Sequence, residues 1–124
     1  MHASGTSLVF VYGTLKRGGS NHHHLAGQTL VGSARTAPGF RLYEVGGYPG
    51  MIPQSLDRDG VQGEVWRVSA ECLARLDELE GLSVGLYRRE RIPLQPPHSD
   101  ESVDAYFYAR TIVGLKDIGA VWRE

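Results

Sequence analysis

Residues Val9–Ser20 read Val-Phe-Val-Tyr-Gly-Thr-Leu-Lys-Arg-Gly-Gly-Ser and join a short apolar run to a glycine-rich loop. The run ends at Tyr12-Gly13, and the loop that follows contains no acidic residue. Glycine lets the chain turn where other residues would clash, so the backbone N–H groups of such a loop can converge on one point. Converging N–H groups bind anions or oxyanions. We therefore expect a β-strand that ends in a site for a negatively charged group.

The nucleotide-binding motif nearest to this loop is the P-loop, G-x-x-x-x-G-K-[ST]. Gly13 and Gly18 have its spacing and Ser20 fits its last place, but Gly19 stands where the phosphate-binding lysine belongs. Pro38 and several glycines also interrupt the next stretch, so no long helix is expected there. These departures argue against a triphosphate site. For the loop alone, a plain corner between a strand and a turn remains the alternative.

The composition is that of one soluble globular domain, which we expect to span residues 1–124. Hydrophobic residues make up 41% of the chain and charged residues 22%, and the formal net charge is -1. This charge gives no attraction for nucleic acid, and no apolar run approaches the ~20 residues of a membrane span. Met1–Thr6 lack the basic and apolar regions of a signal peptide. We expect residues 1–6 to form a loose N-terminal tail.

The cysteine and histidine residues give no metal or cofactor site. Cys72 is the single cysteine, so no internal disulfide can form, which predicts a reducing compartment and a cytoplasmic location. It lies in a helical pattern, where a small buried apolar side chain is the usual role. Three consecutive histidines, His22–His24, point in different directions on a helix, and no further ligand spacing completes a set. We expect neither a metal nor a cofactor.

The secondary-structure signals predict an α+β fold. The 16 glycines and 6 prolines are spread along the chain and mark turns rather than a linker. Short strands between Gly-rich turns are typical of a small curved sheet or barrel. One helix is expected at Ser69–Glu80 and a short one from Asn21 to Leu25, with Ser20 or Asn21 as its cap. The expected strands are Leu8–Tyr12, Thr29–Ala37, Phe40–Val45, Gly60–Val68, Tyr87–Leu94 and Ser102–Ala109.

The helix Ser69–Glu80 places a carboxylate among its apolar side chains. It begins with a serine that suits the N-cap, and a glycine that suits the C-terminal cap follows it. At ~100° per residue, Leu73 and Leu76 lie in one apolar arc. Glu80 falls within this arc, and Asp77 lies at its edge. The pattern therefore directs Glu80 toward the protein interior.

Two effects are expected to raise the pKa of Glu80 above the ~4.3 of a free glutamate. Burial disfavours the charged form, and a carboxylate at the C-terminal end of a helix meets an unfavourable dipole. A carboxyl group in such a place is a candidate general acid or base. The alternative is that the last turn frays and Glu80 turns to water, where it pairs with Arg88 or Arg89.

The loop is one of several short motifs between residues 8 and 110. They are Val11–Gly18, Asn21-His22, Leu25, Gly47–Gly50, Gly63–Trp66, Leu76–Gly81, Tyr87-x-Arg89 and Tyr108. Tyr-Gly-Thr-Leu combined with a later Asp-x-x-Glu-Gly is far more specific than either motif alone. On these residues the chain resembles the gamma-glutamylcyclotransferase-like family. The resemblance is greatest to the gamma-glutamylamine cyclotransferase branch and to the small bacterial proteins similar to it.

The resemblance implies a fold, an activity and a set of site residues. The fold would be a small mixed β-barrel with a few flanking helices. The activity would be that of a lyase or acyltransferase, which cyclises a gamma-glutamyl group to 5-oxoproline and releases an amine or amino acid. Glu80 would be the catalytic acid and base. The implied substrate-binding residues are Tyr12, Gly13, Thr14, Leu15, Tyr108 and Arg89.

In that reaction the α-amine of the substrate attacks its own γ-carbonyl and closes a five-membered ring. Because both groups belong to one small molecule, the protein needs neither a nucleophile nor a metal. Two alternatives keep the same fold and pocket: a non-catalytic small-molecule binding module, and a deprotecting cyclotransferase in a biosynthetic pathway. The presence of both Glu80 and the loop weighs against the module. The leaving amine and the oligomeric state do not follow from these residues.

Overall fold

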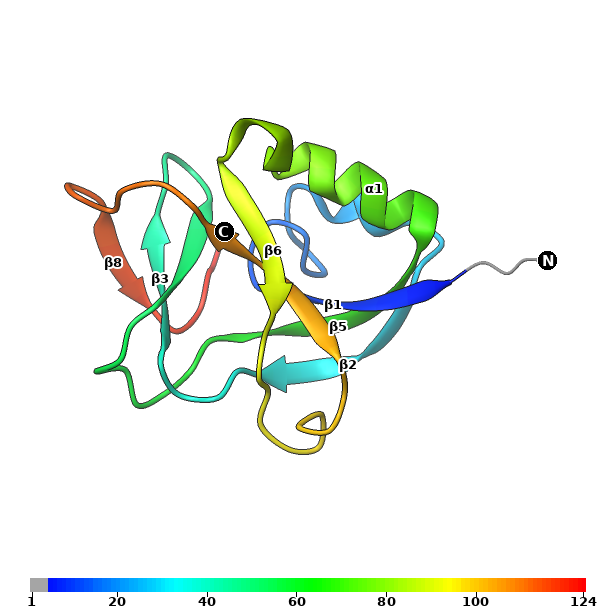
Figure 1. Ribbon diagram of the computed structural model, residues 1–124, viewed down its shortest axis with the longest axis horizontal. Helices are drawn as coiled ribbons and strands as arrows, with labels where there is room; N and C mark the ends of the chain where they lie inside the picture. The colour runs from blue at the N-terminus through cyan, green and yellow to red at the C-terminus, as the bar shows by residue number, and fades with distance from the viewer. Residues whose placement is uncertain (1–4) are drawn as a thin grey trace.

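The structure is a computed structural model that describes residues 5–124 and contains one eight-stranded sheet (Figure 1). It confirms the α+β class and the six predicted strands, each within a few residues of its predicted bounds. Two strands, β4 and β8, were not predicted. The elements are β1 (Thr6–Val11), η1 (His22–Leu25), β2 (Thr29–Arg35), β3 (Phe40–Glu44), β4 (Pro49–Pro53), β5 (Gln62–Ser69), α1 (Ala70–Leu79), η2 (Leu82–Val84), β6 (Tyr87–Arg91), β7 (Val103–Tyr108) and β8 (Lys116–Gly119).

The start of the described chain is part of the sheet. Thr6, which we assigned to the tail, is the first residue of β1 and lies opposite Ser69 of β5. Of the rest of the predicted tail, Gly5 precedes the strand, and residues 1–4 lie outside the described residues. The ordered sheet therefore begins earlier than the sequence indicates.

The sheet is mixed, as predicted, but it is open, so the predicted small β-barrel does not close. Its strands follow the order β2-β5-β1-β7-β4-β3-β8, with β6 paired to β7 outside this path. Figure 1 shows β2 and β8, the two ends of the path, on different sides of the molecule. An isolated bridge between Thr36 and Leu94 joins the segments after β2 and β6 but extends no ladder. A barrel closes only when each strand pairs on both edges, whereas this sheet branches at β7.

The branch point arises because two strands share one edge of β7. Along one edge, β6 pairs antiparallel with β7 over Asp104–Tyr108. Along the other edge, β1 pairs parallel with Val103–Ala105 and β4 pairs parallel at Phe107. β1 therefore leaves β7 where β4 joins it, and we call this place the fork. Crevices beyond strand ends, where neighbouring strands diverge, are common ligand sites in open sheets.

β1 is buried on both faces, which explains its continuous apolar run. Val9 and Val11 pack in one cluster with Leu76 and Cys72 of α1, while Phe10 packs in a second cluster on the other face. The helix covers β1 and β5 (Figure 1). Cys72 is fully buried, so its predicted role as an apolar core side chain is confirmed.

The predicted helix at Ser69–Glu80 is confirmed together with both of its caps. The Ser69 hydroxyl accepts the Cys72 N–H at 3.1 Å, and Glu80 is the C-cap residue. Gly81 follows with φ 69°, the left-handed conformation that favours glycine at this position. The caps therefore fix where α1 ends and place Glu80 at that end. Among residues 5–124, no helix has the length and apolar character needed to span a membrane.

Candidate active site

A cavity of about 330 Å³ lies at the fork. Four stretches of the chain that are distant in sequence line it: the end of β1 with its loop, the β3–β4 turn, the end of α1 with the start of β6, and β7. The lining residues are Phe10, Val11, Tyr12, Gly13, Thr14, Leu15, Ser20, Asn21, Gly47, Tyr48, Pro49, Leu79, Glu80, Leu86, Tyr87 and Tyr106. Glu80 is the one carboxylic acid in this set, and no lysine, arginine or histidine belongs to it.

The loop Gly13–Leu15 uses its carbonyl groups for its own structure. They accept hydrogen bonds from the Lys16 N–H (3.1 Å), the Asn21 N–H (2.9 Å) and the His22 ring (2.9 Å). Asn21 also donates from its side chain to the Thr14 hydroxyl at 3.0 Å. By contrast, the three backbone N–H groups of Gly13–Leu15 donate to no other group among residues 5–124. The loop lines the cavity and has backbone donors without partners among the described residues, as an anion site requires.

Gly13 is required by the close approach of the loop to β4. A Cβ atom at this position would lie 2.6 Å from Cγ of Pro49 and 3.0 Å from its Cδ. Real Cβ atoms do not approach ring carbons so closely, and a proline ring cannot turn away. Glycine therefore lets the loop lie against β4 at the cavity wall.

Tyr12 spans the fork through its hydroxyl group. The hydroxyl donates to the Tyr106 carbonyl of β7 at 2.6 Å and accepts the Met51 N–H of β4 at 3.1 Å. The ring is buried, and burial raises the pKa of Tyr12 well above its usual range, with the nearby Glu80 charge as a second cause. Tyr12 lines the cavity, but its one hydroxyl proton is committed to the protein.

Glu80 lies in the cavity as a partly buried carboxyl group with no side-chain hydrogen bond and no ion pair among the described residues. Burial raises its pKa to about 7. The alternative pairing with an arginine does not occur. Arg88 pairs with Glu90 at 2.7 Å, and Arg89 pairs with Asp77 at 2.8 Å. A carboxyl group in this state can accept and return a proton near neutral pH.

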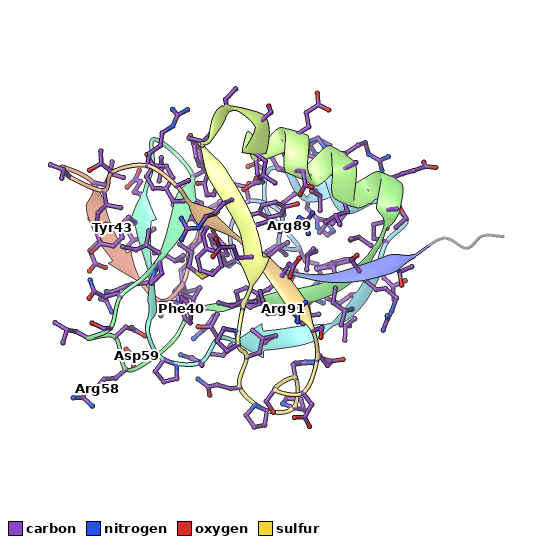
Figure 2. All side chains as sticks on the ribbon, in the orientation of Figure 1. Phe40, Tyr43, Arg58, Asp59, Arg89 and Arg91 are labelled. Carbon is purple, nitrogen blue, oxygen red and sulfur yellow. The ribbon has the colours of Figure 1, made fainter. Side chains whose placement is uncertain are left out.

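Arg89 does not line the cavity and instead holds a network behind it. Figure 2 shows Arg89 between β6 and α1. Its guanidinium donates to both carboxylate oxygens of Asp77 at 2.8 and 3.1 Å and to Asp104 at 2.8 Å. Asp77 also accepts the Tyr106 hydroxyl at 2.7 Å. The structure thus joins Arg89 to a cavity residue through Asp77, and it does not bring the guanidinium into the site.

The tyrosines of the site differ from those that the sequence indicates. Tyr108 is not a lining residue, because its ring packs edge-on against Tyr87 with 5.5 Å between the centroids. Three other tyrosines, Tyr48, Tyr87 and Tyr106, line the cavity. The Gly47–Gly50 and Tyr87-x-Arg89 motifs contain two of them and were the available signals. No sequence pattern distinguished Tyr106 from Tyr108, because residues two positions apart in a strand lie on the same face.

The histidine tract forms η1, a 3-10 helix at the side of the loop. Asn21 occupies its N-cap position, as predicted, but its side chain makes no capping hydrogen bond. His22 packs against Trp66, with 5.3 Å between the ring centroids, and supports Leu15 from outside the cavity. In the part of the chain that the structure describes, no three His, Cys, Asp or Glu side chains form a group suited to a metal ion.

Comparison with known proteins identifies the family to which the sequence is similar. The family described as Gamma-glutamyl cyclotransferase, AIG2-like matches residues 9–121. A Vibrio cholerae protein with the provisional name of a gamma-glutamylcyclotransferase is 46% identical over 85 residues, which cover 68% of this chain and 70% of that protein. The gamma-glutamylcyclotransferase family protein YtfP of Escherichia coli K12 is 36% identical over 108 residues, which cover 87% of this chain and 88% of YtfP.

A solved structure shares the fold. An AIG2-like protein from Mus musculus superposes with a TM-score of 0.68 at 28% identity and covers 89% of this chain and 79% of the mouse chain. Together with the sequence matches, it confirms the resemblance that the motifs predict.

Proposed function

This chain belongs to the gamma-glutamyl cyclotransferase, AIG2-like family, and we propose that it cyclises a small gamma-glutamyl substrate to 5-oxoproline with release of an amine or amino acid. The observation that carries the proposal is the environment of Glu80. Its carboxyl group lies in the cavity at the fork without an ion-pair partner among residues 5–124, and burial raises its pKa to about 7. Gly13–Leu15, whose N–H groups have no partner among residues 5–124, line the same cavity.

In the proposed reaction, Glu80 moves one proton twice. It takes a proton from the α-ammonium of the substrate, whose pKa is ~8. The amine then attacks the γ-carbonyl, and Glu80 returns the proton to the leaving amine as the γ-carbon–nitrogen bond breaks. The second proton lost by the attacking nitrogen also goes to the released amine, which leaves as an ammonium ion. A carboxyl pKa of about 7 instead of 4.5 lowers the free-energy deficit of the first transfer by about 3 kcal/mol, at ~1.4 kcal/mol per pKa unit. This is the chemical benefit of burying Glu80.

The loop Gly13–Leu15 supplies the complementary half of the site. A gamma-glutamyl group carries an α-carboxylate, and its γ-carbonyl oxygen becomes negative as the ring closes. Backbone N–H groups stabilise both kinds of oxygen, because their dipoles are already oriented before reaction. We propose that the N–H groups of this loop bind one of these two oxygens. No metal or separate nucleophile enters this mechanism.

We keep two alternatives. A binding module would keep the cavity without turnover, and a deprotecting enzyme would use the same chemistry on a larger leaving group. We place the reaction in the cytoplasm, because the single cysteine, Cys72, is buried and unpaired, as suits a reducing compartment.

The test is to incubate the protein with a panel of gamma-glutamyl amines, dipeptides and larger amine conjugates and to measure 5-oxoproline by mass spectrometry. We expect product from at least one member and a ~10²–10⁴-fold lower rate for Glu80→Gln. Glu78→Gln is the matched control, because Glu78 is an exposed glutamate on the same helix. Undiminished turnover by Glu80→Gln would contradict the role of Glu80. Tight binding without product across the panel would favour the module.

A further inference from the structure

Three of the four tyrosines that line the cavity, Tyr12, Tyr87 and Tyr106, donate their hydroxyl protons to the protein. The Tyr106 hydroxyl donates to Asp77 at 2.7 Å, the Tyr87 hydroxyl to the Pro49 carbonyl at 2.7 Å, and the Tyr12 hydroxyl to the Tyr106 carbonyl at 2.6 Å. A hydroxyl group has one proton and two lone pairs. Once the proton is committed, such a group can only accept a hydrogen bond from a ligand.

The direction of these bonds is forced by the partners. A backbone carbonyl has no proton to give, so Tyr87 must be the donor to Pro49. The Asp77 carboxylate receives two hydrogen bonds from Arg89, at 2.8 and 3.1 Å, so its oxygens act as acceptors in this network. Tyr106 must therefore donate to Asp77. Since Arg89 is itself held by Asp104, the proton of Tyr106 is kept turned away from the cavity.

The loop and these side chains therefore differ in hydrogen-bond character: the loop has donors, and the side chains have acceptors. The loop Gly13–Leu15 has backbone donors without partners among residues 5–124, whereas the side-chain oxygens of Glu80, Tyr87 and Tyr106, on the other lining segments, are left as acceptors. Burial raises the pKa of both tyrosines, and the nearby Glu80 charge adds to the effect, so the three groups lie within electrostatic reach of one another. Among the residues that the structure describes, no positively charged side chain lines the cavity to compete for these acceptors.

We propose that Tyr87 and Tyr106 bind the α-ammonium group of the substrate together with Glu80, and that Asp77 and Arg89 are positioning residues for Tyr106. The proposal rests on the proposed function, because it assigns a subsite to that substrate. An ammonium group has three N–H donors, and the site offers three acceptors. When Glu80 removes one proton, the two tyrosine oxygens still hold the remaining N–H groups. The nitrogen lone pair first faces Glu80, and rotation about the Cα–N bond then turns it toward the γ-carbon, where the new bond forms.

The test measures binding without turnover. The probes are the sulfonamide analogue of glutamine, in which a sulfonyl group replaces the γ-carbonyl, and its counterpart without the α-amine. Calorimetric titration gives the affinity ratio of the two probes. We expect the wild type to bind the amine-bearing probe about tenfold or more tightly, because hydrogen bonds to a charged group are strong. Tyr87→Phe and Tyr106→Phe should each lower this ratio at least ~3-fold and leave the affinity for the counterpart unchanged.

Two further variants separate recognition from structure. Tyr43→Phe is the matched control, since Tyr43 lies on β3 and does not line the cavity, and it should keep the wild-type ratio. Asp77→Ala keeps both tyrosines but frees the Tyr106 proton to turn inward, so it should lower the ratio as Tyr106→Phe does. Thermal unfolding of each variant identifies any that fails to fold, in which case the other tyrosine variant decides.

The possible results separate this inference from the proposed function. An unchanged ratio in both tyrosine variants, or an equal loss of affinity for both probes, would overturn the ammonium subsite. If the wild type still produces 5-oxoproline in that case, the proposed function stands without the ammonium subsite. If the wild type binds neither probe and forms no 5-oxoproline from the panel, both are overturned.

Discussion

At the scale of the single residue, the burial of Glu80 favours proton transfer but lowers the stability of the folded protein above neutral pH. Burial raises its pKa to about 7 in the folded protein, from 4.5 in the absence of such an environment. The folded state therefore binds this proton more tightly than the unfolded chain does. The resulting stability is fully present below pH ~4.5 and is lost as the pH rises through about 7. Above that pH, the folded protein holds an ionised carboxylate in an unfavourable place.

We therefore predict that Glu80→Gln raises the free energy of unfolding at about pH 8, because glutamine cannot ionise. The expected gain is about 1–3 kcal/mol after allowance for partial exposure of the side chain. It should shrink as the pH falls through about 7 and vanish near pH 4. Urea denaturation at a series of pH values measures it, with Glu78→Gln as the control. A gain of equal size at pH 4 and pH 8 would show that ionisation is not its cause.

At the scale of the element, the contact between the Gly13–Leu15 loop and β4 shapes the cavity wall. We predict that Gly13→Ala lowers the free energy of unfolding by about 1–3 kcal/mol, the usual effect of overpacking, and reduces turnover. The reason is the 2.6 Å approach of a Cβ atom to the Pro49 ring.

The control for this change is Gly32→Ala in β2, where a Cβ atom would meet His98 at an ordinary 3.6 Å. Thermal unfolding and 5-oxoproline formation measure both variants. If Gly13→Ala matches Gly32→Ala in both measurements, the loop does not depend on this close contact.

Elements with a strong local signal were predictable, and those that depend on pairing were not. α1 carries its own period and caps, so the sequence indicates both its bounds and the inward direction of Glu80. β4, by contrast, begins and ends with proline, which removes a ladder donor and argues against a strand. β8, Lys116–Gly119, has two charged residues and a glycine, all unfavourable in strands. These two strands form because β3 pairs with both of them.

At the scale of the whole molecule, the fork decides which side chains meet. Tyr106 and Tyr108 lie on one face of β7. Tyr106 reaches the cavity because it lies where β4 replaces β1 along the edge of β7. The same holds for Arg89, whose partner Asp77 comes from α1. The motifs predict the loop and Glu80, but the cavity between them results from a parallel pairing across about 95 residues of chain, which no local pattern contains.

Tyr12 connects the two branches of the sheet at this fork, and its hydroxyl should contribute to the stability of the whole molecule. Tyr12→Phe removes the acceptor of the Met51 N–H on β4 and the donor to the Tyr106 carbonyl on β7. Unpaired buried groups of this kind cost about 1–3 kcal/mol. We therefore predict a loss of this size in the free energy of unfolding by urea, with faster amide hydrogen exchange at Met51. Tyr43→Phe should change neither quantity. Unchanged exchange at Met51 in Tyr12→Phe would mean that the strand ladders alone hold β4 to β7.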